Sequence, residues 1–129
     1  MITVTQLNKI GEDERGATHY FSTDRTGQFI VAYRKAGSAS GRHYHKGVSP
    51  HKNPEQIIIM QGEAMISWFD TRTSNHAQRE SIHVQAPVMV EIAAWAWHEV
   101  MAVTGIIVFE LNGLEDAKHD TFRMINEGV

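Results

Sequence analysis

Residues 37–62 read G-S-A-S-G-R-H-Y-H-K-G-V-S-P-H-K-N-P-E-Q-I-I-I-M-Q-G, and this segment is the most informative part of the chain. Its two histidines, His43 and His45, lie two residues apart, so on an extended strand both imidazoles project from the same face. Glu55 opens the apolar run I-I-I-M, which ends at a glycine, and a lone histidine, His98, follows later in W-A-W-H-E-V. Three imidazoles and one carboxylate form a nitrogen and oxygen set that suits a divalent transition metal.

The rest of the chain consists of short β-like runs separated by turn residues, at the spacing typical of a sandwich or barrel. A helical pattern is confined to residues 114–118, and the sequence shows no internal repeat or linker. The sequence therefore predicts a single all-β domain over residues 1–129. The expected strands are Thr3–Leu7, Ala17–Ser22, Gln28–Lys35, Arg42–His45, Gln56–Met60, Ala64–Phe69, Glu80–Gln85, Val88–Ile92, His98–Val103 and Ile106–Leu111.

Composition narrows the functional classes. A chain of 129 residues with 42% hydrophobic and 21% charged residues is typical of one globular domain. The net charge of −3 argues against nucleic acid as a partner, and the apolar runs are too short to cross a membrane. There is no cysteine, so a metal must be held by imidazole and oxygen. The first residues do not resemble a signal peptide, and we expect a cytoplasmic protein.

The segment 46–54, K-G-V-S-P-H-K-N-P, separates the histidine pair from the carboxylate. Its glycine and prolines exclude a central strand and indicate a loop. The loop is either a plain solvent-exposed connection or a rim that shapes substrate access. In the second case, His51 and Lys52 supply polar contacts to the substrate.

These residues carry a family resemblance. The first motif of the cupin superfamily is G-x5-H-x-H-x(3,4)-E-x6-G, and the chain resembles it at Gly37, His43, His45, Glu55 and Gly62. One departure is the gap between the second histidine and the glutamate, which is longer by about five residues.

The second cupin motif, G-x5-P-x-G-x2-H-x3-N, is matched less well. His98 takes the place of its histidine, but Ala93 stands where proline is usual, Trp95 where glycine is, and Ala102 where asparagine is. The substitutions leave the shape of the turn before His98 open.

The resemblance implies a double-stranded β-helix, or jelly-roll, barrel. It also implies one divalent metal ion per chain, bound by His43, His45, Glu55 and His98. Zinc is the expected metal, with iron, manganese or nickel as alternatives. Because cupins commonly pair through edge strands and apolar sheet faces, we also expect a homodimer.

A second similarity concerns the runs G-Q-F-I-V-A-Y-R-K-A-G, E-Q-I-I-I-M-Q-G-E-A and I-I-V-F-E-L-N-G-L-E-D-A-K-H-D-T-F. They resemble the C-terminal zinc cupin domain of bacterial enzymes that make sugar nucleotides for capsular polysaccharide. The expected function is therefore isomerisation or epimerisation of a sugar or nucleotide sugar. An Fe²⁺-dependent dioxygenase and a non-catalytic cupin that binds a small molecule are the alternatives.

Epimerisation requires an acid and a base that reach the reacting carbon. The candidates are Tyr33, His83 and Lys52. Tyr33 shares a predicted face with Phe29 and Val31, which would turn its hydroxyl toward the cavity. His83 lies between Ile82 and Val84, and a place on the solvent face competes with the catalytic role.

Two tryptophans flank the last predicted ligand. Trp95 and Trp97 share one face of a strand and His98 takes the other. The tryptophans either pack in the core or at a dimer contact, or they form an aromatic wall for a sugar ring. The other histidines, His19 and His76, are expected on the surface, as is His119.

Overall fold

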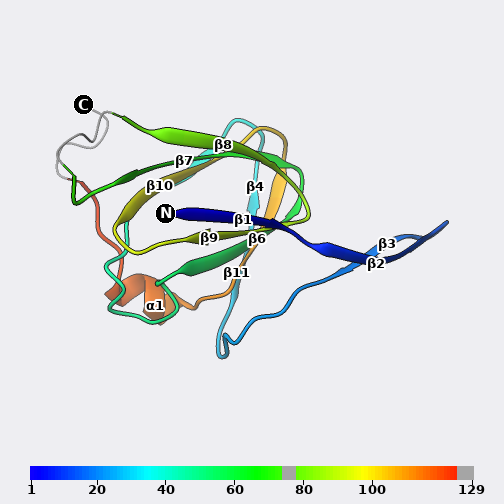
Figure 1. Cartoon of the computed structure of the whole chain (residues 1–129), viewed down its shortest axis with the longest axis horizontal. Coiled ribbons are helices and arrows are strands. Elements are labelled where there is room, and N and C mark those ends of the chain that lie inside the picture. The colour runs from blue at the N-terminus through cyan, green and yellow to red at the C-terminus, as the bar shows by residue number, and fades with distance from the viewer. Residues whose placement is uncertain (74–77, 125–129) are drawn as a thin grey trace.

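The computed structural model describes residues 1–73 and 78–124. One antiparallel sheet has the strand order β1 (Ile2–Gln6), β9 (Val88–Ile92), β6 (Glu55–Gln61), β11 (Ile106–Glu110) and β4 (Ile30–Arg34). The facing sheet has the order β5 (Ala39–His43), β10 (Ala96–Ala102), β7 (Glu63–Asp70) and β8 (Glu80–Gln85). Figure 1 shows the strands of these sheets wrapped around a common interior, as the predicted barrel requires.

Two further elements lie outside the barrel sheets. The hairpin of β2 (Asn8–Asp13) and β3 (Gly16–Tyr20) projects away from them (Figure 1). The short helix α1 (Leu114–His119) follows β11. In residues 1–73 and 78–124, no helix has the length and apolar character needed to span a membrane.

The core fills the space between the two sheets. Strand β6 explains the continuous apolar run of the sequence, because both of its faces are covered. Ile57 and Ile59 point into the main core, whereas Ile58 belongs to a second cluster with Met89 and Leu111. These five side chains are at most 8% exposed, so β6 is anchored from both sides and holds Glu55 at its first position.

Most predicted strands are confirmed within two or three residues of their ends, and the helical segment is present. The clearest omission is β2, in which every residue is exposed. Without a buried face, a strand has no hydrophobic alternation to reveal it. The strand predicted at Arg42–His45 was displaced: β5 ends at His43, and His45 lies beyond it.

The predicted face of β4 was wrong. Ile30, Ala32 and Arg34 line the interior, whereas Val31 is 51% and Tyr33 is 73% exposed. Strand β4 is an edge strand, and the cavity beneath it is lined by its smaller and charged side chains rather than by its aromatic one. The hydroxyl of Tyr33 therefore does not reach the cavity.

Candidate metal centre and cavity

Two of the three histidines of the site, His43 and His98, lie on paired strands. His43, the last residue of β5, is the register partner of His98 on β10. The pairing is irregular beside this point, where Gly41 and Arg42 both adopt positive φ angles of 86° and 59°. A Cβ on Gly41 would lie 3.0 Å from the main-chain oxygen of His98, so the irregularity brings the two strands very close together.

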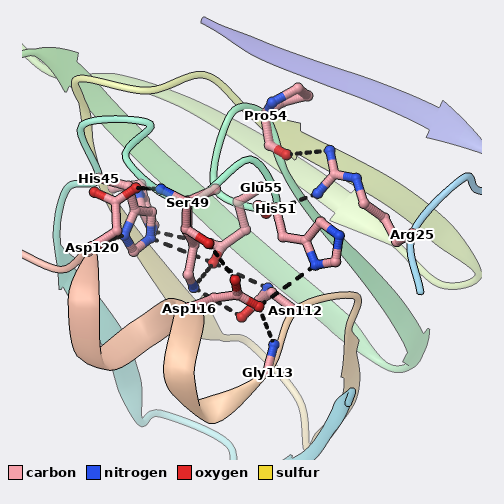
Figure 2. Close-up of polar contacts among 12 residues, drawn as sticks. Arg25, His45, Ser49, His51, Pro54, Glu55, Asn112, Gly113, Asp116 and Asp120 are labelled. Atoms are coloured by element: carbon pink, nitrogen blue, oxygen red, sulfur yellow. Dashed lines mark hydrogen bonds and ion pairs between the residues drawn. The ribbon is translucent and has the colours of Figure 1, made fainter. Parts of the chain in front are cut away.

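His45 is held by the main chain on the far side of the site. Its Nδ1 lies 2.5 Å from the main-chain oxygen of Asp120, just after α1 (Figure 2). The Nδ1 of His98 similarly lies 3.0 Å from the main-chain oxygen of Ala96. Because a carbonyl oxygen can only accept, both Nδ1 atoms carry hydrogen, and both Nε2 atoms are turned toward Glu55.

The three imidazoles meet at one point. The centroid of the His43 ring lies 4.9 Å from that of His45 and 4.8 Å from that of His98, and the last two are 5.2 Å apart. Burial, followed by the neighbouring imidazoles of His98 and His45, lowers the pKa of His43 to about 3. The ring of His43 is therefore neutral at pH 7, as a metal ligand must be.

The donor set fits a divalent metal. One nitrogen from each of the three rings lies within 4.8 Å of the others. The Nε2 of His45 is buried and has no hydrogen-bond partner in the described part of the chain. A buried polar atom without a partner is costly, and a metal ion at this position would remove that cost.

Glu55 lies against the same three rings. Its Oε2 is 3.4 Å from Nε2 of His45, and its Oε1 is 3.5 Å from Nε2 of His98. Burial alone would raise the pKa of Glu55, but contacts with His45, His98 and Lys52 outweigh it and hold this pKa well below its usual value. The carboxyl group is therefore ionised and can add an oxygen to the three nitrogens.

The loop between the histidines and Glu55 is anchored to the segment around α1. Figure 2 shows Asp120 and Asp116 reaching toward it. The carboxylate of Asp120, which is fully buried, accepts hydrogen bonds from the amides of Lys46 at 2.7 Å and Ser49 at 3.0 Å. The hydroxyl of Ser49 donates to Asp116. These hydrogen bonds fix the loop to the segment around α1, and Lys52 is its residue that lines the cavity.

The turn before His98 keeps its shape without the glycine of the cupin motif. Trp95 occupies that position with a φ of 71°, in the left-handed region that glycine favours. Its amide donates to the main-chain oxygen of His45 at 2.6 Å, and its own carbonyl accepts from the amide of Thr71 at 2.9 Å. These tertiary hydrogen bonds stabilise a conformation that costs an ordinary residue about 1–2 kcal/mol.

A cavity of about 520 Å³ opens beside the histidines. Its apolar wall comes from β4, β6, β10 and β11. Its acidic and amide groups, Glu55, Glu110 and Asn112, lie on or just after two neighbouring strands. Its basic side chains are Arg34, Lys52, Lys118 and Arg123. The cavity therefore joins an apolar surface, a group of basic side chains and the histidine cluster.

Of the three residues predicted to transfer protons, only Lys52 lines this cavity. Its side chain is 3% exposed, and its Nζ donates to Glu55 Oε2 at 2.5 Å and to Asn112 Oδ1 at 2.9 Å. Tyr33 lies on the outer surface. His83 is exposed, and its Nε2 lies 3.1 Å from a carboxylate oxygen of Glu63. Of the two predicted places for His83, the structure therefore shows the one on the solvent face. The structure brings neither Tyr33 nor His83 to the site.

The residues predicted to contact substrate do not line the cavity either. Nδ1 of His51 lies 3.6 Å from Asp116 on α1 (Figure 2). Trp97 is 1% exposed and stacks on Phe69 with ring centroids 4.9 Å apart. Trp95 stacks on Tyr44. Packing, rather than an aromatic wall, is the observed environment of both tryptophans.

His19, His76 and His119 were predicted to lie on the surface, and the prediction is met to different degrees. His119 is exposed and His19 is half-buried, whereas His76 lies outside the described residues.

Several polar residues of the cavity, among them Glu110 and Asn112, were not predicted from the sequence. Glu110 ends β11 and shares its inner face with Ile106 and Val108, so strand alternation alone places a carboxyl group on an apolar face. Burial, and then Glu55, raises the pKa of Glu110. Within residues 1–73 and 78–124, its carboxyl group has no hydrogen-bond or ion-pair partner. No sequence pattern pointed to Asn112, because its place in the site depends on the hydrogen bond that it accepts from Lys52.

Comparison with known proteins identifies the family. Residues 11–122 match the family described as polysaccharide biosynthesis C-terminal domain. The chain belongs to this family. The match covers most of the domain, including His43, His45, His98, Glu55 and every residue of the cavity except Arg123. No curated protein matches the chain significantly.

Solved structures place this member of the family in the cupin fold. It is similar to a sugar 3,4-ketoisomerase from Thermoanaerobacterium thermosaccharolyticum in complex with TDP, with a TM-score of 0.72 and 17% identity over 97% of this chain and 89% of that one. It is also similar to dTDP-4-dehydrorhamnose 3,5-epimerase from Bacillus anthracis, with a TM-score of 0.70 and 18% identity over 99% and 83% of the two chains. The predicted jelly-roll barrel is confirmed.

A third similar structure is dTDP-6-deoxy-D-glucose-3,5-epimerase from Legionella pneumophila, with a TM-score of 0.65 and 17% identity. The match covers 84% of this chain and only 65% of the length of that enzyme. At these identities the comparisons establish the fold, whereas the reaction must be argued from the site.

Proposed function

We propose that this protein is a metal-dependent epimerase or isomerase that acts on a nucleotide-linked keto-sugar in polysaccharide biosynthesis. The observation that carries the proposal is the convergence of His43, His45 and His98 on one point beside Glu55, at the wall of a cavity of about 520 Å³. The family match and the cupin fold support the same class of reaction.

The metal would be held by the three histidines and Glu55, one ion per chain. Zinc suits a site of imidazole and carboxylate ligands, and iron, manganese and nickel suit it as well. A bound divalent ion supplies a Lewis acid that polarises a carbonyl oxygen and makes the neighbouring C–H bond more acidic. His45 and His98 are oriented for this role by their Nδ1 contacts with main-chain oxygens.

The charge of the cavity favours an anionic substrate. Arg34, Lys118 and Arg123 line it, and a diphosphate group needs such basic partners. Two of the similar structures are described as complexes with TDP or with TDP-4-keto-6-deoxyglucose. We therefore take the substrate to be a keto-sugar linked to a nucleoside diphosphate, with the sugar toward the histidines.

Glu110 is the strongest candidate for proton transfer to or from that sugar. It lines the cavity on the same face as Glu55, and burial keeps its pKa above the ordinary value, nearer to neutral pH. Efficient acid–base catalysis needs a pKa near the working pH. Two carboxyl groups whose surroundings shift their pKa values in opposite directions, as in Glu55 and Glu110, can divide the roles of ligand and proton carrier.

The experiment begins with elemental analysis of protein purified without a polyhistidine tag, alongside a His43→Ala/His98→Ala variant. We expect nearly one metal ion per chain in the wild type and almost none in the variant. The loaded protein is then incubated with TDP-4-keto-6-deoxyglucose in D₂O, and deuterium entry beside the keto group is followed by NMR. We expect Glu110→Gln to stop this exchange while nucleotide binding is retained.

Contrary outcomes separate the alternatives. Bound iron together with oxygen uptake on chelating substrates would replace the proposal by a dioxygenase. Binding of the nucleotide sugar without deuterium exchange, in metal-loaded protein, would replace it by a non-catalytic binding role.

A further inference from the structure

The loop that separates the histidine pair from Glu55 delivers a buried lysine. Lys52 is 3% exposed, and an isolated β-bridge pairs it with Glu55. Lysine is almost never fully buried unless its charge is paired. Here its Nζ lies 2.5 Å from Oε2 of Glu55 and 2.9 Å from Oδ1 of Asn112. The residues inserted relative to the cupin motif therefore place a cation against the carboxylate of the metal centre.

This contact makes the two oxygens of Glu55 unequal. Oε2 accepts from Lys52 and also lies 3.4 Å from Nδ2 of Asn112. Oε1 faces Nε2 of His98 at 3.5 Å. The ammonium group thus engages the oxygen that also lies 3.4 Å from Nε2 of His45, whereas the other oxygen is turned toward His98.

The negative charge of Glu55 is thus already paired before any metal binds. The ammonium group of Lys52 lies against this carboxylate, and both side chains are at most 5% exposed. A divalent cation would meet repulsion from the buried ammonium group and only a partly available negative charge. Electrostatic interactions in a buried site are only weakly screened by water and salt. We therefore expect the charge of Lys52 to change metal affinity more than a small change in the orientation of Glu55 would.

We propose that Lys52 withdraws the charge of Glu55 from the metal, so that the centre holds its metal less tightly but binds an anion on that metal more strongly. The inference rests on the metal site of the proposed function and extends it. The enolate that results when the carbon beside a keto group loses its proton would be such an anion, with the charge on the former keto oxygen. The lysine therefore tunes the site toward stabilising negative charge rather than toward retaining its metal.

The test is Lys52→Met, measured with metal alone. Zinc affinity is determined by competition with a chromophoric chelator, and azide is titrated into the cobalt-loaded protein while the visible absorption of Co²⁺ is followed. We expect the variant to bind zinc at least about 10-fold more tightly and azide at least about 10-fold more weakly. A lysine that only supported the local structure would weaken both affinities when removed.

Lys46→Met is the matched control. Lys46 lies in the same loop, but its side chain is exposed and covers Phe122 instead of lining the cavity, so neither affinity should change. If Lys52→Met does not fold, Lys52→Gln keeps a hydrogen-bond donor without the charge and should shift both affinities in the same directions. Weaker or unchanged zinc binding in a folded variant would overturn the inference.

These measurements involve no sugar substrate. If Lys52→Met shifts both affinities as expected but the wild-type protein exchanges no proton with a keto-sugar, the role of Lys52 is supported and the proposed reaction is overturned. A wild-type protein that binds no divalent metal would overturn both.

Discussion

His43 and His98 face each other directly across the β5–β10 ladder, with ring centroids 4.8 Å apart and ring planes at 88°. The pairing of two strands that are distant in the chain thus sets the separation of two candidate ligands. A site built on paired strands is held more rigidly than one built on loops. The third ring, His45, depends instead on the contact with Asp120 beyond the end of β5.

The ladder geometry predicts the effect of removing one ring. We expect His98→Ala to lower zinc affinity by more than about 100-fold, since loss of a ligand should cost more than loss of an outer partner. The far-UV circular dichroism should stay unchanged, because the backbone pairing of β10 does not need the ring. His83→Ala is the control, as this exposed histidine lies away from the cluster. Equal losses in the two variants would contradict the assignment of the site.

The carboxylate of Asp120 should be important for both stability and metal binding. Asp120→Ala removes the acceptor for the amides of Lys46 and Ser49 in a fully buried position. We expect the free energy of unfolding in urea to fall by about 2–4 kcal/mol, because hydrogen bonds to charged groups are strong and both amides lose their partner. Zinc affinity should fall as well, since the lost carboxylate anchors the amide of Lys46, next to His45, and fixes the residue whose main-chain oxygen contacts His45. Asp120→Asn, which keeps one acceptor, should lie between the wild type and the alanine variant.

The turn at Gly62 should not tolerate a side chain. Its φ is 91°, and a Cβ would lie 2.2 Å from the main-chain oxygen of Gly105. Gly62→Ala should therefore destabilise the protein by about 3 kcal/mol or more, because strain adds to a clash with backbone atoms. Gly105→Ala, in the neighbouring connection between β10 and β11, is the matched variant, because the nearest atom lies 3.8 Å from the added Cβ. Similar melting temperatures for the two variants would show that the backbone at residue 62 relaxes freely.

The raised pKa of Glu110 predicts a pH-dependent stability. Because the folded state binds this proton more readily than the unfolded state, the stabilising contribution is present below the ordinary pKa of 4.5 and is lost as the pH rises through the folded pKa. Glu110→Gln stays neutral throughout and avoids this loss. We expect the variant to be more stable than the wild type at pH 8, with the difference vanishing toward pH 4.5, in thermal melts across that range.

Glu63→Gln provides the comparison, because Glu63 lies outside the cavity and contacts the exposed His83. A wild type that is more stable than Glu110→Gln at pH 8 would contradict the pKa shift. The expected gain in stability would also mean that the wild-type chain sacrifices some stability to keep a carboxyl group in the cavity.

Several elements could be read from residue order because their evidence is local. The strands with one buried face follow the alternation of apolar residues, and β6 follows its continuous run. The spacing of His43 and His45 suggested a shared face, and their rings do meet, although His45 lies beyond the strand. The exposed strand β2 was missed and the face of β4 was misassigned, because neither had a pattern that separates solvent from cavity.

The all-β class, the cupin resemblance and the identity of the residues available to bind a metal follow from the sequence alone, because they depend on residue type and on spacing along the chain. The pairing of Lys52 with Glu55, the contact of Asp120 with His45 and the place of Glu110 in the cavity follow only from the folded structure. Each of these depends on which distant segments meet and on how much water they exclude. Burial and charge pairing are properties of the folded neighbourhood, and no local pattern encodes them.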